Sequence, residues 1–532
     1  MLFPTPLLDA LRAAPATPAF EHGARIVTRG ELLELIRRLT DALREAGLGP
    51  GRAVAVRTEV TPEAFAAHMA AHVLGCRVVG IRPGYPPGQL EHVLGMGVDA
   101  VIVDPATATP RLLRAGTPLS LGPVPGATDL LARPARATGL PSGQADRADR
   151  AGHAGPAGPA GYPAYASGDW SPVVAARPDD VAVLTFTSGS TGRPKGCAIT
   201  YRALTEHWAW QPRVWGPVAA ALARGFERYL LFGTLASMVV LEFLAPCLLG
   251  GGMAVIPEDD GRPLFPYAIE RHRITGSIIT VPRLSAMLER VDKADVSSLR
   301  ALMVSGSPIG PRRLAEAAAR LGPVVYQGYG QTEAGNVAML TPEHIAAGVV
   351  ASVGRPHPGV ELSVRDEDGL ELPPGRTGEV HVRSPYVMAG YWGDERETHE
   401  TLRDGWLRTR DLGHVDADGF LHLAGRTRDV IMVNAMVVYA GPIERVLTGH
   451  PGVAEAYVAG APDEGTGEAV HAFVVPAQGR APDRAALCEL VRAELGEDSV
   501  PKTITMVPGV PVAISGKPDK RALLTQYGTS VL

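Results

Sequence analysis

The chain has 532 residues, which is too long for one compact core and predicts two or more domains. With 45% hydrophobic and 20% charged residues, its composition is typical of a soluble globular protein. The 51 Lys and Arg residues are outnumbered by 56 Asp and Glu and form no dense run, so the sequence gives no sign of a nucleic-acid-binding surface.

Three further features of the sequence bear on the cellular compartment in which the protein is expected. The four cysteines are far apart and match no metal-ligand spacing, so we expect no disulfide framework and a reducing, cytoplasmic location. Residues 1–20 lack a basic start and carry Asp9 among prolines, which argues against a secretory signal. Residues 230–256 carry only Glu242 as a charge, but three glycines at 250–252 divide them. We therefore interpret this segment as a buried helix that leads into a short strand, with no membrane span.

The first part of the chain alternates helices with strands. Thr28 and Glu31 form a capping box at the start of a helix, and Gly47 is placed to end it. The apolar residues of this helix share one face: Leu32, Leu35, Ile36, Leu39 and Leu43. Strands are expected at 53–56 and 78–81, with a helix around 65–74 between them. This alternation predicts an α/β fold with a mostly parallel sheet.

Residues 133–172 change composition to Ala, Gly, Pro and Ser. The Gly-Pro-Ala period at 155–161 is too short for a collagen helix. We expect a disordered surface excursion here and assign it no function.

An apolar strand at 181–186 leads into the sequence Thr-Phe-Thr-Ser-Gly-Ser-Thr-Gly-Arg-Pro-Lys-Gly at 185–196. Backbone N–H groups and small hydroxyls of such a loop can close around an anion. The Walker pattern is excluded because Pro194 precedes Lys195 and no Ser or Thr follows it. A flexible linker is the alternative, but linkers rarely fix an Arg-Pro-Lys-Gly ending. The candidate phosphate-binding residues are Thr187, Ser188, Gly189, Ser190, Thr191, Gly192 and Lys195.

Residues 186–196 resemble the phosphate-loop signature of the adenylate-forming superfamily, which contains acyl- and aryl-CoA ligases, adenylation domains of peptide synthetases and luciferases. Further matching segments follow in family order between residues 27 and 524. The resemblance implies a large N-terminal domain, 1–425, of mostly parallel sheets with helices and a small β region. It also implies a small, mobile α+β C-terminal domain, 426–532, that is joined to the first by a hinge.

Two further segments are assigned to the nucleotide through the resemblance. Ser305, Gly306 and Ser307 follow a strand at 301–304 and correspond to the loop beside the adenine edge, although alone they are an ordinary strand-ending turn. In the sequence Gln-Gly-Tyr-Gly-Gln-Thr-Glu at 327–333, Tyr329 is implied to stack on adenine, with Gly330 beside it.

The same segment ends in two residues with implied catalytic roles. Thr332 is implied to contact the α-phosphate, and Glu333 is implied to be the Mg²⁺ ligand, a role that suits a hard carboxylate oxygen. A solvated turn is the structural alternative, and it would make the order Tyr-Gly-Gln-Thr-Glu accidental.

The ribose site is implied to lie at Asp411, in the sequence Gly-Trp-Leu-Arg-Thr-Arg-Asp at 405–411, because a carboxylate can accept both hydroxyls. Arg426, at the hinge, is implied to touch ribose or phosphate. The segment 431–439 follows the family pattern with two departures, Ala435 and Val437. In CoA ligases this loop lines the pantetheine tunnel, so added bulk there puts the thioester step in question.

Lys517, in the sequence Ser-Gly-Lys-Pro-Asp-Lys-Arg at 515–521, corresponds to the lysine of the first half-reaction. A lysine on a Gly-flanked loop can reach into another domain, and its charge suits an oxyanion between the carboxylate and the α-phosphate. Taken alone, a lysine near the end of a chain is usually solvated.

The substrate pocket is implied to form around a helix that begins near Phe232 and the loops at 305 and 329. Its candidate residues are Gly233, Thr234, Ser237 and Gly328. Amino-acid-activating relatives place an aspartate just after the phenylalanine, whereas this chain has no carboxylate before Glu242. A buried ammonium would lack a counter-ion, so an ordinary α-amino acid is not the expected substrate. Many acyl and aryl ligases have a bulky His where this chain has Gly233. We leave His207, in an aromatic-rich helix, as a packing residue.

The resemblance implies an enzyme that uses ATP and Mg²⁺ to convert a carboxylic acid into an acyl-adenylate, with CoA as the second substrate. An alternative keeps adenylation and passes the group to a carrier protein or directly to an amine, including a diazotase that activates nitrite. A non-catalytic nucleotide-binding sensor is disfavoured because Glu333, Asp411 and Lys517 are all present.

Overall fold

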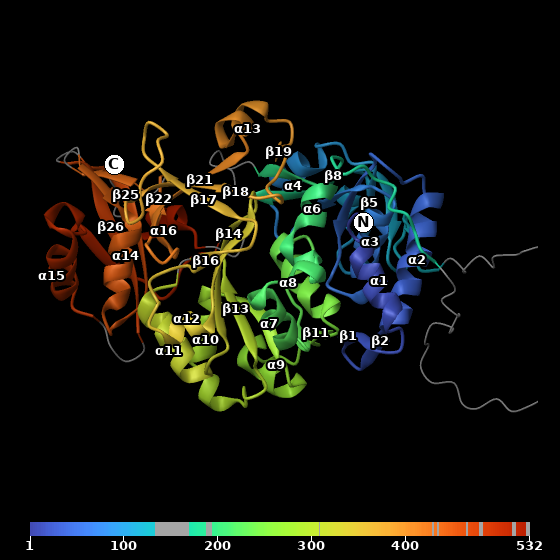
Figure 1. The fold of residues 1–532 in the computed structure, drawn as a ribbon, viewed down its shortest axis with the longest axis horizontal. Helices are drawn as coiled ribbons and strands as arrows, with labels where there is room; N and C mark the ends of the chain where they lie inside the picture. Colours follow the sequence, from blue (N-terminus) through green and yellow to red (C-terminus); the bar gives the residue numbers. More distant parts are fainter. Residues whose placement is uncertain are drawn as a thin grey trace, which may run out of the picture.

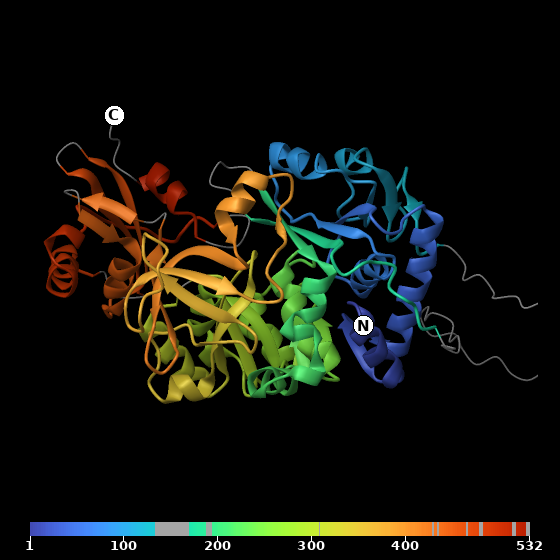
Figure 2. The same ribbon diagram turned by 45° about the horizontal axis from the view of Figure 1, so that its top comes forward.

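The computed structural model describes residues 1–132, 170–187, 194–307, 309–427, 430–433, 436–463, 466–477, 482–512 and 518–527. Two helix-covered sheets make up most of the molecule, a small antiparallel sheet lies above them, and the C-terminal sheet lies at one end (Figure 1; Figure 2). The expected excursion at 133–172 falls outside the described residues except for 170–172.

The first sheet has the strand order β19-β9-β8-β4-β3-β5-β6-β7. Its strands are parallel from β8 to β7, and the edge strands β9 and β19 pair in the antiparallel sense. The strands are β3 Ala53–Arg57, β4 Arg77–Gly80, β5 Ala100–Val103, β6 Thr117–Ser120, β7 Thr128–Asp129, β8 Val181–Thr187, β9 Lys195–Thr200 and β19 Gly390–Tyr391.

The second sheet has the order β16-β15-β14-β13-β12-β10-β11-β1-β2, with antiparallel pairs only toward its two edges. The strands are β1 Pro18–His22, β2 Arg25–Thr28, β10 Arg228–Leu230, β11 Met253–Ile256, β12 Gly276–Thr280, β13 Ala301–Ser305, β14 Val325–Gln331, β15 Gly335–Leu340 and β16 Arg355–Pro356. Both sheets therefore confirm the expected α/β class with mostly parallel pairing.

Helices cover and separate these sheets. They are α1 Thr5–Ala13, α2 Arg29–Glu45, α3 Pro62–Val73, α4 Pro87–Leu94, α5 Pro110–Leu113, α6 Tyr201–Glu206, α7 Pro217–Gly225, α8 Met238–Leu249, α9 Leu264–His272, α10 Val281–Leu288, α11 Pro311–Leu321, α12 Pro342–Ala346 and α13 Glu395–Thr401, with 3₁₀ turns at Trp208–Trp210, Pro212–Val214 and Val291–Lys293. The expected capping box is present, because the Thr28 hydroxyl accepts from Glu31 N and the Glu31 carboxylate accepts from Thr28 N.

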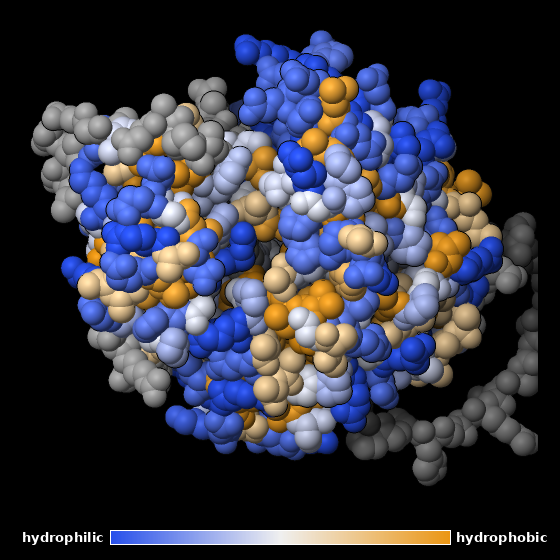
Figure 3. Space-filling view, turned by 60° about the vertical axis from the view of Figure 1, so that its left-hand side comes forward, coloured by the Kyte–Doolittle hydropathy of each residue, from blue (hydrophilic) through white to orange (hydrophobic). Residues whose placement is uncertain are grey.

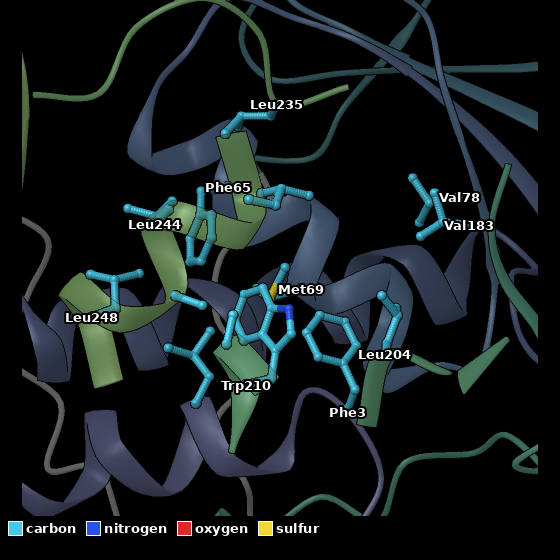
Figure 4. Packing of buried hydrophobic residues seen from close by; sticks show 14 of the residues in the cluster. Phe3, Phe65, Met69, Val78, Val183, Leu204, Trp210, Leu235, Leu244 and Leu248 are labelled. Atoms are coloured by element: carbon cyan, nitrogen blue, oxygen red, sulfur yellow. The ribbon is translucent and has the colours of Figure 1, made fainter. Parts of the chain in front are cut away.

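The largest core lies where helices of the two sheets meet. Phe65 and Met69 of α3 and Leu244 and Leu248 of α8 surround Trp210, whose ring lies 4.8 Å from that of Phe3 (Figure 4). Every residue of helix α3 except Glu63 is buried, and α8 is buried along most of its length, as expected for helices that are mostly apolar on all sides.

The segment 230–256 forms strand β10, helix α8 and strand β11, which fits the interpretation as a buried helix leading into a strand. In the described part of the chain, no helix reaches the length and hydrophobicity of a membrane span.

The small antiparallel sheet has the order β17-β18-β21-β20, and β22 also pairs with β21. Its strands are β17 Glu361–Arg365, β18 Gly378–Arg383, β20 Leu402–Arg403, β21 Trp406–Val415 and β22 Leu421–Arg426. A turn in which Asp416 Oδ1 accepts from Phe420 N joins β21 to β22.

The C-terminal sheet has the order β24-β23-β26-β25, with β27 paired to β26. Its elements are β23 Val430–Val433, β24 Met436–Tyr439, α14 Ala440–Gly449, β25 Val453–Asp463, β26 Gly467–Pro476, α15 Arg484–Leu495, a 3₁₀ turn at Glu497–Ser499, β27 Thr503–Met506 and α16 Lys520–Tyr527. It has its own core, in which Ile443 and Leu447 of α14 are buried with Val458 of β25. The domain boundary at 425/426 stays a prediction.

Arginine side chains join the two parts, and Arg312 makes two of these hydrogen bonds. Arg312, on α11 of the large part, donates from Nε to the carbonyl oxygen of Thr448 at 3.0 Å and from Nη2 to that of Val453. Figure 3 views the molecule from this end, where hydrophobic residues are interspersed among hydrophilic ones.

Candidate active site

Two of the predicted phosphate-loop residues, Thr187 and Lys195, lie at the end of the β8–β9 pairing. Strands β8 and β9 are antiparallel, and Thr187 is opposite Lys195 in their register. Ser188, Gly189, Ser190, Thr191 and Gly192 lie outside the described residues. The roles of all these residues in phosphate binding stay predictions.

Lys195 is held by a carboxylate that the sequence did not point to. Its Nζ lies 2.6 Å from Glu397 Oε1, and Arg410 Nη2 lies 2.9 Å from the same oxygen. Burial alone would raise the pKa of Glu397, but the contacts with Lys195 and Arg410 outweigh burial and lower it. Glu397 is therefore ionised at neutral pH, between two cations.

The loop between β14 and β15 carries Thr332 and Glu333. The Tyr391 hydroxyl donates to Glu333 Oε1 at 2.9 Å, and Met388 N donates to the Glu333 carbonyl oxygen, so the loop is anchored to the β19 segment. Thr332 is half-buried next to it. Lys195 Nζ lies 5.3 Å from the centre of the Tyr391 ring, which places Glu333 near the phosphate-loop lysine.

The donor set at Glu333 fits Mg²⁺ held together with a nucleotide. Among the described residues, no group of three or more His, Cys, Asp or Glu side chains could hold a metal ion. Mg²⁺ usually takes only one or two protein carboxylates and completes its shell with water and substrate phosphates. A single glutamate such as Glu333 therefore suits this ion in the presence of ATP.

Asp411 is the centre of a buried hydrogen-bond network, with 3% of its surface exposed. Its Oδ2 accepts from the Tyr329 hydroxyl at 2.6 Å and from Gln331 Nε2 at 2.5 Å, and its Oδ1 accepts from Arg426 Nε at 2.7 Å. Burial, followed by the charge of Asp411, raises the pKa of Tyr329 well above its usual value. The structure thus brings together three residues predicted to hold the nucleoside: Tyr329, Asp411 and Arg426.

Close packing explains two of the predicted glycines, against a side chain at Gly328 and against backbone at Gly330. A Cβ at Gly328 would lie 2.6 Å from Asn336 Nδ2, and one at Gly330 would collide with the carbonyl oxygen of Gly335. Ser305 Oγ donates to the Gly328 carbonyl oxygen at 3.2 Å, which joins the end of β13 to β14. Gly306 follows with φ +96°, a conformation that favours glycine, and Ser307 comes next.

The predicted pocket residues are only partly brought together. The helix expected to begin near Phe232 begins instead at Met238, because residues 231–237 form an irregular turn in which Gly233 has φ +94°. Phe232 and Gly233 line a cavity of about 590 Å³ beside the ends of β1, β10 and β11. Thr234, Ser237 and Gly328 are not part of its lining. No atom lies within 4 Å of a Cβ built at Gly233, so the space beside it is open.

A buried network lies on the other side of the Glu333 loop. We expected His207 to lie in a helix, but it lies between α6 and a 3₁₀ turn. Its Nδ1 accepts from Ala209 N at 3.2 Å, and its Nε2 lies 3.5 Å from Glu242 Oε1, which also accepts from Trp208 Nε1 at 3.0 Å. Burial raises the pKa of Glu242 to about 8 and lowers that of His207 to about 3. Both groups are therefore neutral at neutral pH, as in a packed core.

Lys517 and Ala435 lie outside the described residues, so their predicted roles stay predictions. Several residues at the site were missed by the sequence reasoning: Gln331, Tyr391, Glu397 and Arg410. Gln331 and Arg410 lie inside motifs that were identified, next to Thr332 and Asp411, so their positions were the available signal. Tyr391 and Glu397 reach the site only because β19 pairs with β9, about two hundred residues earlier in the chain.

Comparison with known proteins agrees with this arrangement. Residues 8–392 match the AMP-binding enzyme family, and residues 442–517 match the AMP-binding enzyme C-terminal domain. The chain is 32% identical over 526 residues to a feruloyl-CoA synthase from Amycolatopsis, covering 97% of each protein. It is 36% identical over 365 residues to a fatty acid–[acyl-carrier-protein] ligase from Streptomyces coeruleorubidus, covering 66% of this chain and 68% of that protein.

Among solved structures, the fold resembles the amide bond synthetase McbA from Marinactinospora thermotolerans, with a TM-score of 0.81 and 34% identity over 98% of this chain and 99% of that one. The matched residues 8–392 include Lys195, Tyr329 and Glu333. The chain therefore belongs to the AMP-binding enzyme family and is an adenylate-forming ligase.

Proposed function

We propose that the enzyme uses ATP to convert a carboxylic acid into an acyl-adenylate, releases pyrophosphate, and then transfers the acyl group to CoA. One observation carries the proposal: a series of side-chain contacts connects the predicted metal and phosphate residues with Arg410, which is bonded in sequence to the predicted ribose residue. Glu333 contacts Tyr391, whose ring faces Lys195, and Lys195 shares Glu397 with Arg410, the neighbour of Asp411 in sequence. A nucleotide bound along this series would have its ribose at one end and its phosphates at the other.

The chemistry follows from these positions. An oxygen of the carboxylate attacks the α-phosphorus, the bond from that phosphorus to the bridging oxygen breaks, and pyrophosphate leaves with the electron pair. Asp411 would accept the ribose hydroxyls, Lys195 would bind the leaving phosphates, and Lys517 would neutralise the charge that develops between the acid and the α-phosphate. Mg²⁺, held by Glu333, would supply charge neutralisation on the phosphates.

A second acceptor is favoured by a specific observation. The similarity to an amide bond synthetase extends over nearly the whole chain, and the space beside Gly233 is open where many acyl and aryl ligases are expected to have a bulky His. Direct transfer to an amine is therefore our second candidate. Transfer to a carrier protein, supported by the Streptomyces relative, and activation of nitrite are further alternatives.

Pyrophosphate release with candidate acids, nitrite included, tests the proposal, with each reaction run alone, with CoA and with amines. We expect release that depends on a carboxylic acid, and a thioester only when CoA is present. An amide formed without CoA would favour the second candidate, and ATP that is never split to AMP would contradict both.

Lys517→Ala separates the two half-reactions. The variant should lose adenylation and still form the product from supplied acyl-adenylate, because the lysine is assigned to the first step only. Lys502→Ala is the matched control, since Lys502 is an exposed lysine of the same domain that pairs with Asp463. Equal loss of both steps in the Lys517 variant would contradict its assignment.

A further inference from the structure

Glu397 joins two cations that come from distant parts of the chain. It lies on α13, Lys195 starts β9, and Arg410 lies within β21. Both cationic nitrogens contact the same oxygen, Glu397 Oε1, and the three side chains are only 16–21% exposed. Two like charges are thus held side by side at a half-buried position, with a net charge of +1 for the three groups.

The backbone of Arg410 is in a conformation that arginine rarely adopts. Its φ is +61°, in the left-handed region that favours glycine, and it is one of three non-glycine residues with positive φ among the described residues. Such conformations cost free energy and occur most often at functional sites. The adjoining residues fix this geometry, because the Thr409 hydroxyl donates to the Val380 carbonyl oxygen and accepts from Asp411 N.

The side chains of Arg410 and Asp411, which are neighbours in sequence, contact different partners. Asp411 turns toward Tyr329 and the nucleoside site, whereas Arg410 reaches Glu397, the carboxylate that also pairs with Lys195. A guanidinium presents several N–H donors in a planar fork that matches the oxygens of a phosphate. Arg410 is therefore placed between the expected ribose end and the expected phosphate end of one nucleotide.

We propose that Arg410 binds the β- and γ-phosphates of ATP together with Lys195, and that Glu397 positions both cations before the nucleotide arrives. The proposal rests on the proposed function, because it requires ATP in this site. It adds a binding residue for pyrophosphate, the group that ATP carries and AMP lacks. Glu397 acts through the two cations and is a positioning residue.

The difference between ATP and AMP gives the test. Arg410→Gly should fold well because glycine accepts φ +61° without strain, and Arg410→Lys keeps the charge. Equilibrium binding of ATP, pyrophosphate and AMP is measured on the full-length protein and on both variants by calorimetry. For Arg410→Gly we expect ATP and pyrophosphate to bind at least tenfold more weakly and AMP to change less than twofold, with partial recovery in Arg410→Lys. Arg408→Ala is the control, because Arg408 lies two residues earlier on the same strand and pairs with Glu379.

The binding results that would contradict this proposal differ from those that would contradict the proposed function. Equal weakening of ATP and AMP by Arg410→Gly would show that Arg410 only positions Asp411, and unchanged binding of all three ligands would also overturn the proposal. A wild-type protein that binds neither ATP nor AMP would overturn the proposed function and this inference with it. A wild-type protein that binds both, with no selective loss in the variant, would overturn this inference alone.

The role of Glu397 is tested by combining substitutions. If Glu397 acts by positioning Arg410, the effects of Glu397→Gln and Arg410→Gly on ATP affinity should be far from additive. Additive effects, or no effect of Glu397→Gln on ATP affinity, would remove Glu397 from the proposal.

Discussion

The Tyr329 hydroxyl donates a 2.6 Å hydrogen bond to Oδ2 of Asp411, and this contact joins β14 of the second sheet to β21 of the small sheet. Asp411 is thereby held in place before any nucleotide binds. Tyr329→Phe should remove one of its donors and leave Gln331 and Arg426. A hydrogen bond to a charged group contributes about 1.5–3 kcal/mol, so we expect AMP and ATP to bind roughly tenfold or more weakly.

The measurement is the dissociation constant of AMP, which reports the nucleoside site alone. Tyr326→Phe is the matched control, since Tyr326 lies on the same strand but near Arg224 and Glu343. An unchanged affinity for AMP in Tyr329→Phe would show that Asp411 does not need this donor.

Glu333 provides a prediction about magnesium. Glu333→Gln keeps the size of the side chain and an oxygen that can accept from Tyr391, but it loses the charge that a divalent cation prefers. We expect pyrophosphate release to fall by about a hundredfold or more and the Mg²⁺ concentration at half-maximal rate to rise, because charge neutralisation at transferring phosphates is a large term. The measurement is the rate of release against Mg²⁺ concentration.

Glu343→Gln is the control for this variant, because Glu343 lies in the first turn of α12 and accepts a hydrogen bond from the N-cap residue Thr341. AMP binding should change little in Glu333→Gln. A variant with the wild-type Mg²⁺ dependence would refute the assignment of Glu333.

The fold class could be predicted because its signals are local. The capping box at Thr28 and the apolar face of α2 depend only on residues within five turns of one helix, and the structure contains both. The start of α8 was predicted wrongly near Phe232 because a positive φ at Gly233 delays the helix, and an apolar sequence does not reveal that turn.

The site residues also fall into two groups, those that a local sequence pattern marks and those that only the fold brings to the site. Motifs mark Lys195, Tyr329 and Asp411, since each is surrounded by its own short pattern. Glu397 carries no pattern and reaches Lys195 only through the pairing of β19 with β9, a contact that depends on the whole fold. Sequence could therefore name the residues expected to touch the nucleotide, but not the residues that hold them.

The contact between α11 and the C-terminal part gives a prediction about domain movement. Arg312 donates to the carbonyl oxygens of Thr448 and Val453, and each such bond contributes about 1 kcal/mol. Arg312→Ala should therefore loosen the arrangement and make limited chymotrypsin cleavage between β22 and α14 several times faster. Arg320→Ala, on the same helix but bonded to Leu288 within the large part, should cleave at the wild-type rate. Equal rates in both variants would show that Arg312 does not hold the domains together.

The buried pair of Glu242 and His207 predicts opposite pH effects on stability. The pKa of Glu242 is raised from 4.5 to about 8, so its favourable contribution is complete below pH 4.5 and is lost as the pH rises toward 8. The pKa values of His207 and His357 are lowered from 6.5 to about 3 and about 4, so their contribution is complete above pH 6.5 and is lost as the pH falls. Tyr386 and Trp208 also face this pair, and neither titrates in that range.

Glu242→Gln isolates the alkaline part of this effect. Glutamine cannot ionise, and its amide oxygen can still accept from Trp208 Nε1. Relative to wild type, the variant should gain stability steadily between pH 5 and pH 8, by a few kcal/mol at most, because it escapes the cost of protonating on folding a carboxyl group that is ionised in the unfolded chain. Denaturant unfolding at several pH values measures this difference. Glu400→Gln, at a half-exposed helix position, is the control and should show no such trend. A stability difference between Glu242→Gln and wild type that is the same at pH 5 and pH 8 would mean that Glu242 keeps an ordinary pKa in the folded protein.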